Sequence, residues 1–287
     1  MLAVIKKELQ AYFSSLTGYI FLGLFLFLSG IFFTLTNLRA ASPDYNGVFS
    51  NITFIFLLVV PILTMRLMAE EARNKTDQLL LTSPLTLTSI VVGKYLAAIS
   101  VFLITLAITF LYPIILSTMG EISVAEIIGG YIGFFLLGSS MIVIGLFISS
   151  LTENQVISAV VTFSALLFLW ILDWIIQGLP SDQSSGVIFA VILSLAAAAL
   201  VYFTTRNLYV GAGILLAGLI ITGVVYFVDA SLYAGFVGRF VEWFSLLARY
   251  QDFSMGILAL SPVVYYITFI CAFLFLTVRM LEKKRWS

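Results

Sequence analysis

The feature that most constrains this chain is a series of eight apolar runs, each long enough to cross a lipid bilayer. A spanning helix needs about 20 mainly apolar residues. The runs are continuously apolar and do not alternate in pieces of about 10 residues, so they indicate helices and not barrel strands. The predicted fold is an all-α integral membrane protein, a polytopic helical bundle. The predicted spans are Tyr19–Thr36, Ile52–Met68, Tyr95–Ser117, Ile127–Ile148, Val156–Ile176, Val187–Thr204, Val210–Val228 and Val263–Val278.

The composition fits a lipid environment and limits the chemistry. Of 287 residues, 62% are hydrophobic and 10% are charged, against about 45–50% and about 25% in soluble domains. The 14 Lys and Arg balance the 14 Asp and Glu, which gives no sign of nucleic-acid binding. There is no His and one Cys, Cys271, so His-based catalysis and an internal disulfide are excluded. Gly93-Lys94 is no phosphate loop, because Tyr95 stands where Ser or Thr is needed. We expect no enzyme activity, cofactor or metal in this chain.

The distribution of Lys and Arg predicts the orientation, because cytoplasmic loops are enriched in both. With both termini in the cytoplasm, eleven basic residues fall on the inner side and three on the outer side. Both termini lie on one side only if the number of spans is even. Eight spans satisfy this condition, and so would six, because spans six and seven form a hairpin whose loss as a pair changes no orientation. We expect a multi-pass protein of the cell inner (plasma) membrane. The inner residues are Lys6, Lys7, Arg66, Arg73, Lys75, Lys94, Arg206, Arg279, Lys283, Lys284 and Arg285, and the outer ones are Arg39, Arg239 and Arg249.

Two segments outside the spans have the pattern of interfacial helices. In the first, Ile5, Leu9, Tyr12, Phe13 and Leu16 fall at helical spacing, with Lys6, Lys7, Gln10 and Ser14 opposite; the alternative is a frayed tail. The second, Gly238–Leu258, carries four charges that would together cost about 10 kcal/mol or more at mid-membrane. We predict an interfacial or partly re-entrant outer helix there, with a polar stripe of Glu242, Ser245, Arg249 and Asp252.

The longest polar stretch on the predicted inner side is Ala69–Lys94, AEEARNKTDQLLLTSPLTLTSIVVGK. Charges of both signs precede three leucines, a pattern that favours a short helix docking into a partner's groove. A basic loop that anchors spans two and three fits equally well. A second inner loop, Ser149–Val156, is short and polar, and by itself it indicates a turn. Asp173 is the one acid inside an apolar run; it lies between Trp170 and Trp174, which indicates an interface where it could simply be hydrated.

Several of these segments resemble one family. Lys7–Gly30 (KELQAYFSSLTGYIFLGLFLFLSG) is similar to the start of permease subunits of type 2 ABC exporters, especially the GldF-like gliding-motility-type branch. Glu70–Ala97 resembles the coupling region of that family, of the form EE-x-R-x-G-T-x-E-x-L-L-x-x-P…G-K. Ser149–Phe163 and the tail from Gly256 to Trp286 are also similar. The coupling region departs from the family pattern at Lys75, where the family usually has Gly, and at Asp77, which begins the following pair differently; the hairpin 187–228 looks like an insertion into a six-span core.

The resemblance implies a single permease domain over 1–287. Within it, 1–17 would form an elbow helix, 69–94 a cytoplasmic coupling region, 187–228 an inserted hairpin and 236–260 an outer interfacial gating segment. Such permeases pair with a second permease copy or a related permease, lie in membrane lipid, and sit on two copies of a cytoplasmic ABC ATPase that binds the ATP. The residues implied for ATPase coupling are Glu70, Glu71, Arg73, Lys75, Thr76, Asp77, Leu79, Leu80, Glu153 and Asn154, and those for the outer gate are Glu242, Arg249 and Asp252.

The expected function is therefore that of a permease subunit of an ABC transporter, an exporter that couples ATP hydrolysis on a separate subunit to transport. Two alternatives stay open. An ion-coupled secondary transporter would need acids or broken helices near mid-bilayer in two matched halves, and the chain offers only Asp173. A non-transporting scaffold of a motility or secretion complex is the other.

Overall fold

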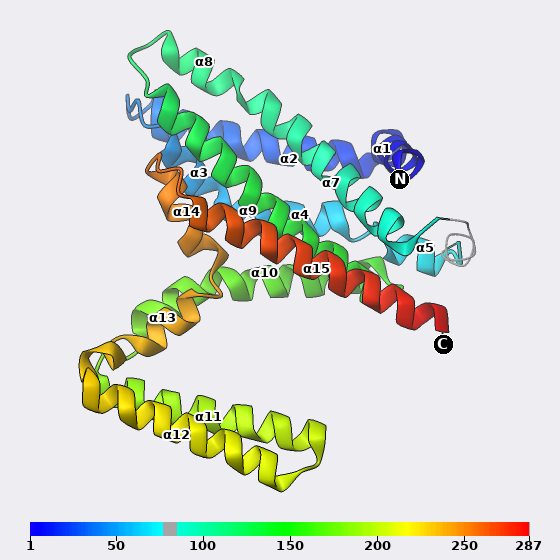
Figure 1. Ribbon diagram of the computed structural model, residues 1–287. Coiled ribbons are helices and arrows are strands. Elements are labelled where there is room, and N and C mark those ends of the chain that lie inside the picture. Colours follow the sequence, from blue (N-terminus) through cyan, green and yellow to red (C-terminus); the bar gives the residue numbers. More distant parts are fainter. Residues whose placement is uncertain (77–84, 287) are drawn as a thin grey trace. The chain divides into compact units, whose positions relative to one another are not determined.

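The computed structural model describes residues 1–76 and 85–286, and every regular element in that part of the chain is a helix (Figure 1). Within these described residues, eight helical stretches are long and apolar enough to cross a membrane, which confirms the predicted all-α, multi-span fold. These stretches are Leu16–Leu38, Asn46–Arg73, Leu87–Ser117, Val124–Leu151, Gln155–Gly178, Gln183–Thr205, Leu208–Val228 and Leu260–Arg285.

Several of these stretches are interrupted helices. The first half of the chain contains α1 (Leu2–Ser14), α2 (Leu16–Phe33), η1 (Thr34–Leu38), α3 (Asn46–Ile52), η2 (Thr53–Ile55), α4 (Phe56–Thr64), α5 (Ala69–Arg73), α7 (Leu87–Thr109), α8 (Leu111–Ser117) and α9 (Val124–Leu151). The second half contains α10 (Gln155–Gly178), α11 (Gln183–Thr205), α12 (Leu208–Val228), η3 (Ala230–Tyr233), α13 (Phe236–Glu242), α14 (Leu246–Ser254) and α15 (Leu260–Trp286). The break between α7 and α8 lies three residues before Pro113, whose ring nitrogen cannot donate to the preceding turn.

The chain divides into two compact units, and the larger one, Met1–Trp170 with Leu246–Ser287, is built around α9. Helices α4, α7, α14 and α15 pack against α9, most of which is buried. Phe25, Phe56, Phe102 and Phe134 come from four helices and meet in its core, with the rings of Phe56 and Phe134 4.7 Å apart. A Cβ atom at Gly138 would lie 2.5 Å from the Phe102 ring. The glycines of α9 therefore permit close helix packing within the chain.

The smaller unit, Ile171–Ser245, contains the antiparallel pair α11 and α12, which is the predicted hairpin. The Asp182 side chain caps α11 by accepting the backbone N–H of Ser185 at 3.0 Å. Hydrogen bonds from Ser184 and Ser185 lower the pKa of Asp182 to about 2. The two helices meet where Gly218 faces Ser194, since a Cβ at this glycine would come within 2.5 Å of the serine hydroxyl. The glycine therefore allows the two helices of the hairpin to pack closely.

The predicted outer segment differs from the structure. In place of one helix over Gly238–Leu258 there are two, α13 and α14, with a break at Trp243–Ser245. Ser245 is buried and donates its hydroxyl hydrogen to Asp173 at 2.5 Å, which removes it from the expected polar stripe. The single-stripe prediction was wrong because the Ser245 side chain satisfies a carboxylate elsewhere in the chain. The same bond gives Asp173 a protein partner, which the expectation of simple hydration did not include.

Candidate functional site

Helix α1 buries one side against the rest of the protein, in addition to having apolar and polar sides. The predicted helix is present, but its buried residues are Val4, Glu8 and Tyr12, spaced one turn apart, on the side that packs against α7. The close approach of the two helices depends on Gly93, where a Cβ atom would lie 3.0 Å from the Val4 side chain. Tyr12 packs into the same hydrophobic core as Leu9 and Phe13 of the predicted apolar stripe, and the prediction missed the carboxylate of Glu8 on the buried side.

That carboxylate belongs to an ion cluster formed by Lys7, Glu8, Glu71 and Lys94. The Lys94 ammonium, only 1% exposed, lies 2.7 Å from Glu8 Oε1 and 2.8 Å from Glu71 Oε2. Lys7 Nζ lies 2.7 Å from Glu71 Oε1 and 3.8 Å from Glu8 Oε1. The two positive and two negative charges balance, and their mutual attraction offsets part of the cost of removing them from water. The cluster joins α1, α5 and the first turns of α7.

Lys7 closes the exposed side of this ion cluster. Partial burial lowers the pKa of the Lys7 ammonium, but the hydrogen bond to Glu71 and the charges of Glu71, Glu8 and Glu70 outweigh it, so the pKa is raised above its ordinary value. Lys7 therefore stays protonated at physiological pH.

Beside the ion cluster, the second membrane-crossing stretch is broken over Met65–Met68. The predicted span Ile52–Met68 adjoins the charged segment that starts at Ala69, but in the structure α4 ends at Thr64 and α5 begins at Ala69. Arg66, inside the break, forms a two-pronged ion pair with Glu70 at 2.7 and 2.8 Å and donates to Thr17 Oγ1 at 2.6 Å. Side-chain contacts therefore replace the missing helical turn.

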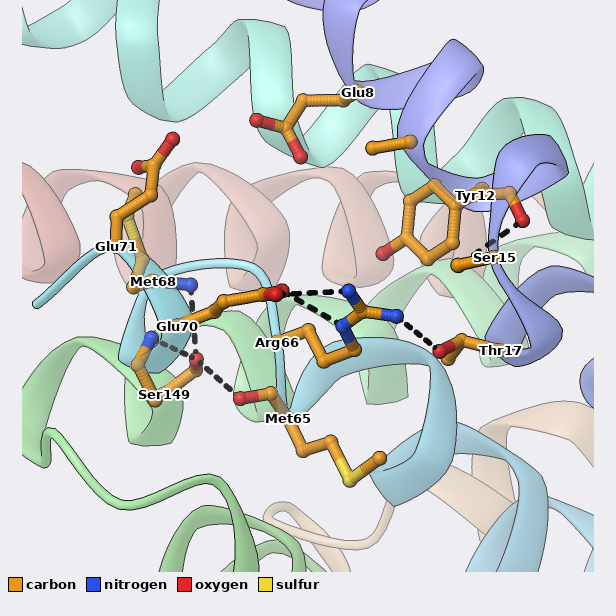
Figure 2. Close-up of polar contacts among 12 residues, drawn as sticks. Glu8, Tyr12, Ser15, Thr17, Met65, Arg66, Met68, Glu70, Glu71 and Ser149 are labelled. Atoms are coloured by element: carbon orange, nitrogen blue, oxygen red, sulfur yellow. Dashed lines mark hydrogen bonds and ion pairs between the residues drawn. The ribbon is translucent and has the colours of Figure 1, made fainter. Parts of the chain in front are cut away.

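Two further side chains satisfy the backbone groups left open by the break. The Tyr12 hydroxyl donates to the carbonyl oxygen of Leu63 at 2.7 Å. The Ser149 hydroxyl of α9 accepts the N–H groups of Met68 and Ala69, both at 3.1 Å, and donates to the Met65 carbonyl at 3.3 Å (Figure 2). Buried backbone groups need such partners. The break is thus built into the fold and held by α1 and α9.

The residues predicted for ATPase coupling separate into two groups. Glu70 and Glu71 turn inward, to Arg66 and to the ion cluster. Arg73, Lys75 and Thr76 are exposed, with Lys75 in the left-handed backbone region at φ 56°. Asp77, Leu79 and Leu80 lie outside the described residues.

In the second loop, Glu153 and Asn154 are also exposed. The Asn154 side chain accepts the N–H of Val156 at 2.9 Å and so caps α10. The Asn154 side chain therefore has a structural role at the start of α10, and Glu153 is the more available of the two for contact with a partner.

The residues predicted for an outer gate lie on two helices. Arg249 and Asp252 lie in α14, whereas Glu242 is exposed in α13 of the smaller unit. The Arg249 guanidinium lies 4.9 Å from the ring centre of Tyr265, a cation–π contact. This contact ties α14 to α15.

Sequence reasoning missed Glu8, Lys94, Arg66, Thr17, Tyr12 and Ser149 as members of this site. One signal was available, because Glu8 occupies the same helical position as Val4 and Tyr12. The arrangement of balanced charges and backbone caps can transmit force or bind a partner. Among the residues that the structure describes, no group of three or more Cys, Asp and Glu side chains could hold a metal ion.

Comparisons with known proteins agree with this architecture. Residues 15–209 match the model of a family described as "ABC-2 family transporter protein". The matched region contains Thr17, Arg66, Glu71, Lys94 and Ser149, but it begins after α1. Searches of curated proteins and of solved structures give no match.

Proposed function

Because the chain belongs to the ABC-2 family of transporter proteins, we propose that it is the permease subunit of an ATP-driven exporter of the GldF-like branch. In this proposal a separate cytoplasmic ATPase binds the ATP, and this chain is not an enzyme. The observation that carries the proposal is the exposed tip Arg73, Lys75 and Thr76, which continues directly from an α5 anchored by the buried ion cluster.

The physical basis is the stiffness of that anchor. A partner that displaces the tip must also move Glu71, whose two oxygens are held by Lys94 and Lys7 at 2.8 and 2.7 Å. Breaking such a buried pair costs about 3–5 kcal/mol. A displacement of the tip is therefore passed on to α7 and α1 more readily than the pair is broken. This is the mechanical link that an ATPase-driven permease needs.

The remaining parts of the assembly follow from the family and from the charge distribution. We propose two ATPase copies and a second permease copy or related permease, embedded in lipid of the cell inner membrane, with both termini in the cytoplasm. The tip and the loop at Glu153 would face the ATPase. The segment 236–260 would lie at the outer surface, and the hairpin 187–228 would be an addition to the six-span core.

The test is ATPase capture by charge-reversed permease. The partner is an ATPase with a phosphate-binding loop and no spans of its own, sought first in the neighbouring reading frame. Arg73→Glu is expected to reduce its co-purification about 10-fold or more, because like charges across an interface cost several kcal/mol. Lys6→Glu is the matched control, since Lys6 is also exposed and basic but lies on α1. Glu71→Lys is a poor probe, because it would also disrupt the ion cluster.

The outcomes separate the alternatives. Equal ATPase capture by all variants, or transport that persists without any ATPase, would contradict the proposal, and the latter would favour an ion-coupled transporter. A complex that hydrolyses ATP while moving no cargo would point to a scaffold.

A further inference from the structure

A single buried hydroxyl connects the two segments that would face the ATPase. Ser149 Oγ is within 3.1 Å of the N–H groups of Met68 and Ala69 and within 3.3 Å of the Met65 carbonyl oxygen. A serine hydroxyl can donate one hydrogen bond and accept two, so this side chain is fully used. Helix α5 has no side-chain cap of its own at Met68. Its N-terminal cap is supplied by another helix.

The surface of α9 that carries Ser149 packs closely against the broken part of the second stretch. One turn earlier stands Gly145, where a Cβ atom would come within 2.2 Å of Thr64 Oγ1 and 2.7 Å of Thr64 Cβ. Thr64 is the last residue of α4, and Ala69 is the first of α5. Gly145 and Ser149 therefore contact opposite sides of the break, and α9 spans it.

The second segment is the direct continuation of the same helix. Helix α9 ends at Leu151, two residues after Ser149, and the loop from Thr152 to Asn154 follows. The end of α9 is itself held, because Lys284 of α15 donates to the Ser150 carbonyl oxygen at 2.7 Å. The start of α5 is thus joined to the second loop by one hydroxyl contact, at Ser149, and by less than one turn of α9.

We infer that Ser149 is a positioning residue that makes α5 and the loop Thr152–Asn154 move as one body. The inference builds on the proposed function, in which an ATPase contacts both segments. A push on either segment would then move α4 and α9 together, although the chain of the second stretch is broken. Without the hydroxyl, α5 would lose its cap and would move independently of α9.

The experiment measures the permease alone first, so that it does not depend on a partner. Spin labels are placed at two exposed positions, Asn74→Cys beyond α5 and Val156→Cys after the second loop, in a Cys271→Ser background. Ser149→Ala is expected to broaden the distribution of distances between the labels. Amide hydrogen exchange at Met68 and Ala69 is expected to become about 5-fold faster, because each lost hydrogen bond contributes about 1 kcal/mol. Exchange in the middle of α9 should stay unchanged.

The matched control is Ser150→Ala. This neighbour is equally buried, but its hydroxyl bonds only to the Phe147 carbonyl of its own helix at 2.6 Å. It is expected to leave the label distances and the exchange at Ala69 unchanged. An unchanged Ser149→Ala variant, or equal effects in both variants, would overturn the inference. Hydrogen exchange alone decides the question if labelling disturbs the fold.

A second measurement adds the ATPase. With Ser149 intact, ATP is expected to shift the signals of both labels together. In Ser149→Ala, ATP should shift the label beyond α5 alone. If no ATPase binds the chain at all, the proposed function fails, whereas the result on the isolated permease still decides the role of Ser149.

Discussion

Replacing Lys94 by Met is expected to lower the free energy of unfolding by about 3–5 kcal/mol, the usual cost of removing one partner of a buried ion pair. Methionine is apolar and similar in length, so the change removes the charge with little change in volume. Glu8 and Glu71 have side chains only 11% and 13% exposed; Glu8 loses its closest cation, and Glu71 loses one of its two. Lys7 remains, but its side chain is 59% exposed and it reaches Glu8 only at 3.8 Å. One buried negative charge is left uncompensated.

Charge balance in the ion cluster also predicts that a second substitution restores stability. Lys94→Met leaves one positive and two negative charges, whereas Lys94→Met with Glu8→Gln leaves Lys7 and Glu71, which still pair at 2.7 Å. Neutral replacement of a whole buried pair is often neutral for stability. The double variant is therefore expected to regain about 2 kcal/mol or more of the loss. This order of stabilities is unusual, because a second substitution in a packed region normally adds damage.

The assay is equilibrium unfolding in mixed micelles, followed by circular dichroism. Lys6→Met serves as the control, since Lys6 is exposed and its replacement should change the unfolding free energy by no more than about 0.5 kcal/mol. The reasoning is refuted if Lys94→Met is as stable as Lys6→Met. It is also refuted if the double variant is less stable than Lys94→Met, because charge imbalance would then not be the cause.

Two further predictions concern the contacts of the helix break. Burial, followed by the charge of Glu8, raises the pKa of Tyr12, so the folded state keeps the phenol proton longer than the unfolded state and stability falls above about pH 10. Tyr12→Phe should lose about 1 kcal/mol at neutral pH and show a shallower alkaline decline in pH-dependent unfolding. Gly145→Ala should cost about 1–3 kcal/mol by overpacking Thr64, whereas Gly223→Ala, with nothing within 4 Å, should cost nothing in the same assay.

The membrane-crossing stretches could be predicted because their signal is local. Length and continuous apolarity decide whether a segment crosses a bilayer, and neither depends on which neighbours it finds. The hairpin of spans six and seven could be predicted for the same reason, since only a short segment separates the two apolar runs; Arg206 adopts the left-handed backbone there, at φ 53°. The breaks within the membrane-crossing stretches were harder to predict. Pro113 gave a signal for the break between α7 and α8, but no proline or glycine lies within Met65–Met68.

The candidate site could be predicted only in part because its contacts join residues far apart in the chain. The charged segment after the second stretch was identified from its composition, yet the direction of its side chains was not. Glu71 is separated from Lys94 by 23 positions, and Glu8 by 86. From the sequence, Lys94 was a basic residue that helped to set the orientation and part of a rejected phosphate loop, and nothing indicated that it is buried. Its pairing depends on how α1 folds back against α7, which no local pattern encodes.

The position of the break has a mechanical consequence. A continuous helix from Phe56 to Arg73 would pass a push from the tip along one axis, into α4 alone. Because the helix is interrupted at Met65–Met68, the push instead enters the side chains that hold the break. These side chains belong to α1, α2, α7 and α9, through Tyr12, Thr17, Lys94 and Ser149. The interruption therefore distributes one displacement over four helices, and removing the contact to one helix should uncouple that helix while the other three still follow.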